Sequence, residues 1–165
     1  MDSASVDPLN PALQRQAVAA LQRALGAELI ETHLSYVLLA SGQAWKIKKA
    51  VNLGFVDFST LGLREHGCRE ELRLNRRTAP TLYLGVLPLT GTPIQPQIAG
   101  TGPTIDWLLH MRGFDPAGLW DRLAREGRLS NAHIDAGMDA LCELHRDAAV
   151  AAPEDPASQP AQARA

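Results

Sequence analysis

The chain has 165 residues and a mass of 17.8 kDa, which is enough for one domain, or for one domain and part of a second. Its 45% hydrophobic and 21% charged residues exclude a wholly disordered chain. A net charge of −2 argues against a nucleic-acid partner, and the sequence has no apolar run of about 20 residues that would span a membrane. Because there are two cysteines and no secretory signal, we expect a cytoplasmic location.

The lysines are unevenly distributed. Of 16 basic residues only Lys46, Lys48 and Lys49 are lysine, and the others are arginine. Lysine is a compact, mobile point charge and arginine is a planar fork, so this cluster favours a lysine-specific contact such as a phosphate. Chance, or a sheet edge blunted by lysine, remains the alternative explanation.

The first half of the chain predicts two helices with strands between them. Asn10 and Pro11 are typical of a helix start, Gly26 of a helix end and Gly42 of a hairpin turn. The expected elements are a helix at 11–25, strands at 29–32, 35–39 and 44–48, and a helix at about 60–78.

The second half predicts strands followed by two further helices. Asp115 and Pro116 are expected to start one helix, which ends at Gly127, and Ser130 to cap the next. We expect disorder in residues 1–9 and in the tail 148–165. The expected elements are strands at 82–87, 94–98 (weak) and 105–111, and helices at 116–127 and 130–147.

This order of elements predicts an α+β fold with an antiparallel sheet. Alternate strand residues share a face, so Lys46 and Lys48 should point one way and Lys49 the other. The order matches the small lobe of a kinase-like fold, in which a strand lysine contacts nucleotide phosphates and is held by a glutamate on the next helix.

The helix expected at about 60–78 carries a run of charged residues, for which a solvated surface with ion pairs four residues apart is the simpler explanation. The run comprises Arg64, Glu65, Arg69, Glu70, Glu71, Arg73, Arg76 and Arg77.

Four segments, 31–39, 44–49, 52–61 and 70–77, together resemble one bacterial family. It is the aminoglycoside-phosphotransferase-like domain that opens bifunctional aminoglycoside phosphotransferase/ATP-binding proteins of the AAA ATPase type. The resemblance runs from about residue 28 to residue 147 and implies a truncated kinase-like phosphotransferase domain at 10–147. Its small lobe would cover about 10–112, and the start of the large lobe about 113–147.

The resemblance also implies a nucleotide-binding site. Lys48 best matches the phosphate-contacting lysine, with Lys46 as the alternative register. Glu71 best matches the helix glutamate, with Glu70 as the alternate. The loop over the phosphates would contain Thr32, His33 and Ser35.

The chain departs from the family in several places. No His-Gly-Asp-like catalytic loop and no metal-binding Asp follows residue 147, so we expect no catalytic residue, no Mg²⁺ ligand and at most weak ATP binding. Ala50 replaces the usual proline, and Gly62 and Gly67 replace better helix formers.

We therefore expect an N-terminal fragment of an ATP-dependent phosphotransferase-like protein that is inactive alone. The alternatives are a non-catalytic nucleotide-binding or protein-interaction module, or a non-functional gene remnant. The apolar stripe of Met138, Leu141 and Leu144 on the helix at 130–147 predicts self-association.

Overall fold

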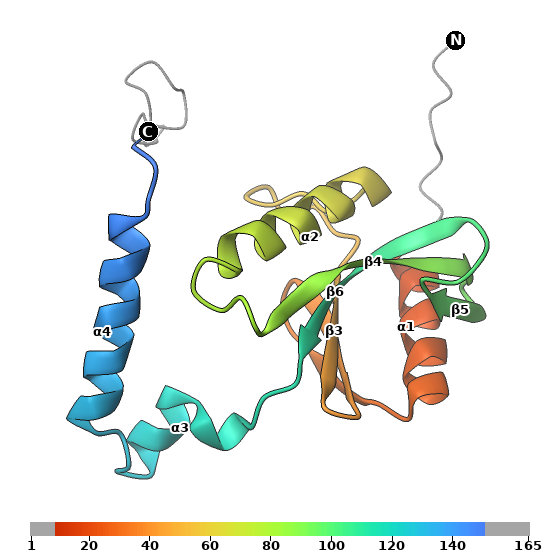
Figure 1. Cartoon of the computed structure of the whole chain (residues 1–165). Coiled ribbons are helices and arrows are strands. Elements are labelled where there is room, and N and C mark those ends of the chain that lie inside the picture. Colours follow the sequence, from red (N-terminus) through yellow and green to blue (C-terminus); the bar gives the residue numbers. More distant parts are fainter. Residues whose placement is uncertain (1–8, 151–165) are drawn as a thin grey trace. The chain divides into compact units, whose positions relative to one another are not determined.

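The computed structural model describes residues 9–150, which form an α+β structure (Figure 1). Two compact units divide between Leu119 and Trp120 and are treated separately below. The disorder expected at residues 1–8 and 151–165 falls outside the described residues. Leu9, for which disorder was also expected, is 1% exposed and belongs to the core, so the expectation is wrong at this residue: its apolar side chain packs with the core rather than in solvent. No helix in residues 9–150 is both long and apolar enough to cross a membrane.

The first unit is built on one antiparallel sheet with the strand order β1-β2-β3-β6-β4-β5, which confirms the predicted α+β class. The central strand β3 pairs with β2 on one side and with β6 on the other. Its strands are β1 (Glu28–Glu31), β2 (Ser35–Ala40), β3 (Gln43–Lys48), β4 (Tyr83–Thr92), β5 (Gln95–Ile98) and β6 (Thr104–Arg112).

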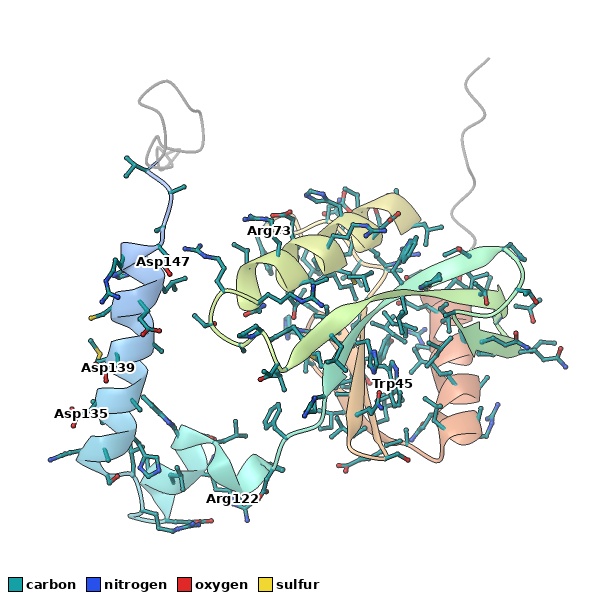
Figure 2. The ribbon with its side chains drawn as sticks, in the orientation of Figure 1. Trp45, Arg73, Arg122, Asp135, Asp139 and Asp147 are labelled. Atoms are coloured by element: carbon teal, nitrogen blue, oxygen red, sulfur yellow. The ribbon has the colours of Figure 1, made fainter. Side chains whose placement is uncertain are left out.

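Helix α1 (Pro11–Leu25) covers one face of this sheet (Figure 1). The side chain of Asn10 accepts hydrogen bonds from the backbone N–H groups of Ala12 and Leu13, both at 3.0 Å, which fixes the predicted helix start. Trp45 of β3 projects toward this helix in Figure 2. The buried core between helix and sheet includes Leu9, Ala17, Val18, Leu21, Tyr36, Leu38, Ile47, Leu89, Ile105 and Leu108.

Helix α2 (Leu61–Asn75) lies against the other face and contacts β3, β4 and β6. It starts after Thr60, whose hydroxyl accepts from the N–H of Leu63 at 3.2 Å. The fully buried residues of α2 are Arg64 and Cys68, so few apolar side chains hold this helix. Polar contacts therefore contribute much of its attachment to the sheet.

The predicted helix at 116–127 is wrong as a single element. A 3₁₀ turn, η1 (Pro116–Gly118), and a separate helix, α3 (Trp120–Arg125), form instead. Leu119 separates them with an extended backbone (φ −66°, ψ 134°), and the preceding Gly118 is a poor helix former.

The second unit contains α3 and α4 (Asn131–Arg146). His133 accepts a hydrogen bond from the backbone N–H of Ser130 at 3.1 Å, which supports the predicted start of α4. The predicted apolar stripe includes Met138 and Leu141, which are 50% and 40% exposed. None of the residues of α4 is buried.

Candidate functional site

The structure places two of the three lysines on a single carboxylate. Lys46 Nζ lies 2.7 Å from Oε1 of Glu71, and Lys48 Nζ lies 2.7 Å from Oε2 of the same side chain. Lys49 instead pairs with Glu31 at 2.6 Å and lies over the ring of Tyr36, which faces the α1 core. The predicted division of the lysines between the two faces is confirmed.

The cluster has two cations and one anion, and therefore carries one surplus positive charge. Burial of Glu71 by itself would raise the pKa of its carboxyl. Hydrogen bonds and charge from Lys46 and Lys48 outweigh that effect, and hold the pKa below its ordinary value. Glu70, the alternative partner, pairs instead with Arg73 at 2.7 Å on the exposed side of α2. The glutamate that contacts both lysines is therefore Glu71.

An apolar pocket of about 190 Å³ opens on the same sheet face as the cluster. Ala44 of β3 lines it, and pairs in register with Leu39 and Met111, which line it as well. Lys46 is two residues further along β3, so its side chain leaves the same face. The full lining is Ile30, Val37, Leu39, Ala44, Met111, Gly113, Phe114, Pro116 and Leu119.

The turn between β1 and β2 contains the residues predicted to lie over the phosphates. The Thr32 hydroxyl donates to the carbonyl of Ser35 at 3.1 Å and accepts from its N–H at 3.0 Å. Ser35 is buried and pairs in register with Lys48, whereas His33 is exposed. The turn thus lies at the Lys48 end of β3. Thr32 and His33 line an open hollow that also includes Lys49, away from the apolar pocket.

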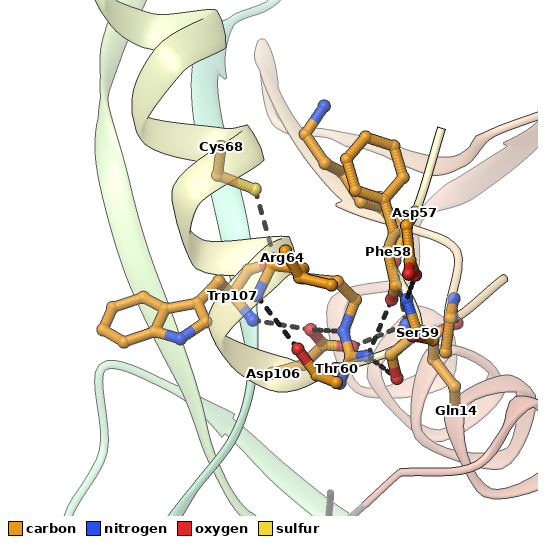
Figure 3. A network of polar contacts seen from close by, with 12 residues as sticks. Gln14, Asp57, Phe58, Ser59, Thr60, Arg64, Cys68, Asp106 and Trp107 are labelled. Atoms are coloured by element: carbon orange, nitrogen blue, oxygen red, sulfur yellow. Dashed lines mark hydrogen bonds and ion pairs between the residues drawn. The ribbon is translucent and has the colours of Figure 1, made fainter. Parts of the chain in front are cut away.

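A buried polar network that the sequence analysis missed ties α1, α2 and β6 together (Figure 3). Arg64 Nε lies 2.8 Å from Oδ1 of Asp106, and both side chains are fully buried. Gln14 donates to Oδ2 of Asp106 at 2.6 Å. Burial raises the pKa of Asp106, against the opposing charge of Arg64 and the hydrogen bonds from Gln14 and Trp107.

Gln14 also fixes the end of β3 beside the lysines. Its amide donates to the carbonyl of Lys48 at 2.9 Å and accepts from the N–H of Ala50 at 2.8 Å. A proline at position 50 would have no N–H to donate, so Ala50 permits this hydrogen bond. Arg64 continues the network by donating to the carbonyls of Phe58 and Ser59, at 3.1 and 3.2 Å.

The arrangement suits a ligand that has an apolar part and an anionic part. The pocket offers an apolar surface, and the neighbouring ammonium groups offer donors with surplus positive charge. Within residues 9–150, no group of three or more His, Cys, Asp or Glu side chains is arranged to hold a metal ion.

Comparison with protein families found no matching family model, and no solved structure matches. Curated proteins from Mycobacterium bovis and from two strains of Mycobacterium tuberculosis, all described as uncharacterized, match over a short segment. Each is 45% identical over 60 residues, which make up 36% of this chain and 12% of the relative. The chain thus matches a small part of much longer relatives, and the match assigns no family.

Proposed function

We propose that the first unit binds ATP, as the kinase-like small lobe of an aminoglycoside-phosphotransferase-like protein. The observation that carries this proposal is the position of the lysine–glutamate cluster beside the apolar pocket, on one face of the sheet. A base would occupy the pocket, and the phosphates would meet the lysines.

The spacing along β3 supports this assignment. Ala44 in the pocket and Lys46 in the cluster are two residues apart, a rise of about 7 Å along a strand. The ribose that joins a base to its phosphates can span such a separation. The surplus positive charge favours a phosphate over a neutral group at this position.

The proposed activity of these 165 residues is binding rather than phosphoryl transfer. In the family that the chain resembles, the catalytic loop and the magnesium ligands follow the helix that α4 matches. Binding is therefore the part of that chemistry that we assign to the residues of this chain. Because residues 9–150 hold no group of three or more His, Cys, Asp or Glu side chains arranged to bind a charge-neutralising metal, we expect ATP to bind with a Kd of about 1 mM, or about −4 kcal/mol.

Calorimetric titration of the purified chain tests this function. We expect ATP to bind more tightly than adenosine, which keeps the base but lacks the phosphates. Tripolyphosphate should bind measurably, and phosphate release should stay at background with or without Mg²⁺. Equal affinity for ATP and adenosine would contradict phosphate binding, and Mg²⁺-dependent turnover would contradict a binding-only role.

A second candidate function is protein interaction through α4. Ile134, Met138 and Leu141 recur at helical spacing and are each at least 40% exposed, which is unusual for a solvated helix. This function would belong to the second unit, and is independent of nucleotide binding by the first.

A further inference from the structure

Glu71 has one more lysine partner than a lysine–glutamate pair requires. Either lysine alone would neutralise its carboxylate, yet both Nζ atoms lie at 2.7 Å. The two lysines differ in their surroundings, so the cluster need not use them in the same way.

Lys48 is enclosed between the sheet and α2. Its side chain is 9% exposed, and its Nζ lies 4.8 Å from the centre of the Phe58 ring. On α2, a Cβ atom added to Gly67 would lie 2.9 Å from Cε of Lys48, so a side chain there would force this stem to shift. Its backbone carbonyl is bound by Gln14. Moving Lys48 away from Glu71 would therefore open a packed contact.

Lys46 lies in a more open position. Its side chain is 28% exposed, about three times the value for Lys48. In the register of the sheet, Lys46 pairs with Val37, which lines the apolar pocket. Its Nζ can therefore turn from Glu71 toward a ligand in that pocket without disturbing α2.

The geometry points to a division of roles, which rests on the proposed function: Lys46 binds the phosphate, and Lys48 is a positioning residue that keeps Glu71 in place. When a phosphate oxygen replaces Oε1 of Glu71 at Lys46, the carboxylate keeps its bond to Lys48. No buried charge is then left without a partner, so ligand binding does not release α2.

The presence of only three lysines allows a direct test on the unaltered chain. Protein labelled with ¹³C-lysine gives three ε-CH₂ signals, which single lysine variants assign to Lys46, Lys48 and Lys49. On addition of ATP or tripolyphosphate, the Lys46 signal should shift most and the Lys49 signal should stay in place. Adenosine should leave all three signals nearly unchanged.

Two matched variants test the same division by function. We expect Lys46→Met to weaken ATP binding by about tenfold or more, as loss of a charge-assisted hydrogen bond does. Lys48→Met should weaken it less, but should speed alkylation of the buried Cys68 on α2 by about tenfold. Burial raises the pKa of the Cys68 thiol to about 12, and the thiolate is the form that is alkylated. The buried thiol therefore reacts slowly, and faster alkylation reports that α2 has opened. Lys49→Met serves as the control.

The outcomes separate this inference from the proposed function. A Lys48 signal that shifts as much as the Lys46 signal, or a greater loss of ATP affinity in folded Lys48→Met, would overturn the division of roles only. If ATP and tripolyphosphate shift no lysine signal, the proposed function is refuted as well.

Discussion

Gly67 of α2 faces Lys48 of β3 so closely that a side chain at position 67 would force its neighbours to shift. A Cβ atom there would lie 2.9 Å from Cε of Lys48 and 2.8 Å from a ring carbon of Phe58. Glycine lowers the helix propensity of α2, but its lack of a side chain leaves space for the Lys48 side chain, which reaches Glu71. Its place in α2 is thus explained by the contact between helix and sheet.

Gly67→Ala should destabilise the first unit although alanine is the better helix former. We expect the displaced Lys48 stem and Phe58 ring to cost about 2 kcal/mol, more than the ~1 kcal/mol gained in helix propensity. Gly62→Ala on the same helix is the matched control, because a Cβ there meets nothing within 4 Å. It should stabilise the unit. Urea unfolding of both variants measures this, and a stabilised Gly67→Ala would contradict the account.

The stability of the first unit should depend on the charge of Glu71. Its pKa is lowered in the folded chain, so its contribution is complete above the unfolded pKa of about 4.3 and is lost as pH falls through the folded value. We expect the free energy of unfolding to drop more steeply below about pH 4.5 for the wild type than for Glu71→Gln. At pH 7 the variant should be less stable by about 2 kcal/mol. Parallel pH profiles from denaturant unfolding would argue against this role.

The buried pair of Arg64 and Asp106 should matter far more than a surface pair on the same helix. Asp106→Asn leaves a fully buried guanidinium without its carboxylate, which should cost about 3–5 kcal/mol. Glu70→Gln removes the exposed partner of Arg73 and should cost less than about 1 kcal/mol. Thermal and urea unfolding compare the two variants. Similar losses would show that the network is not what holds α2 to β6.

The exposed stripe of α4 should drive concentration-dependent association. We expect sedimentation velocity to show oligomers at about 100 μM that dissociate on dilution, and Met138→Glu to remain monomeric. Asp139→Glu, a conservative change at the next position on the helix, should behave as the wild type. A wild-type chain that stays monomeric and binds no hydrophobic dye would exclude association through this stripe.

Features that depend on local sequence could be predicted. Asn10, Pro11 and Gly26 define α1 by their own backbone preferences, and the two-residue period of β3 places Lys46 and Lys48 on one face. The boundaries of β4 were harder to predict. The strand continues past Pro88 to Thr92 because β6 and β5 pair with it. A proline in the sequence predicts a strand end, and pairing between distant segments cannot be read from the local sequence.

The charge run of α2 shows where sequence reasoning stops. Arg69 pairs with Glu65, four residues away, and Arg73 pairs with Glu70, three residues away. Both ion pairs are the kind expected on a solvated helix surface. Arg64 looks the same in sequence, but its partner Asp106 is 42 residues away on β6. The available signal was its helical spacing to Cys68, four residues on, which puts both on the stripe that faces the sheet.

The central claim is that the cluster around Glu71 binds the phosphates of a nucleotide. The most direct test is calorimetric ATP affinity of the wild type beside the double variant Lys46→Met/Lys48→Met, with Lys49→Met as a control that removes one charge from the other face. The account predicts a wild-type Kd of about 1 mM, a loss of about tenfold or more in the double variant, and no change in the control. Wild-type affinity in a folded double variant, or an equal loss in Lys49→Met, would contradict it.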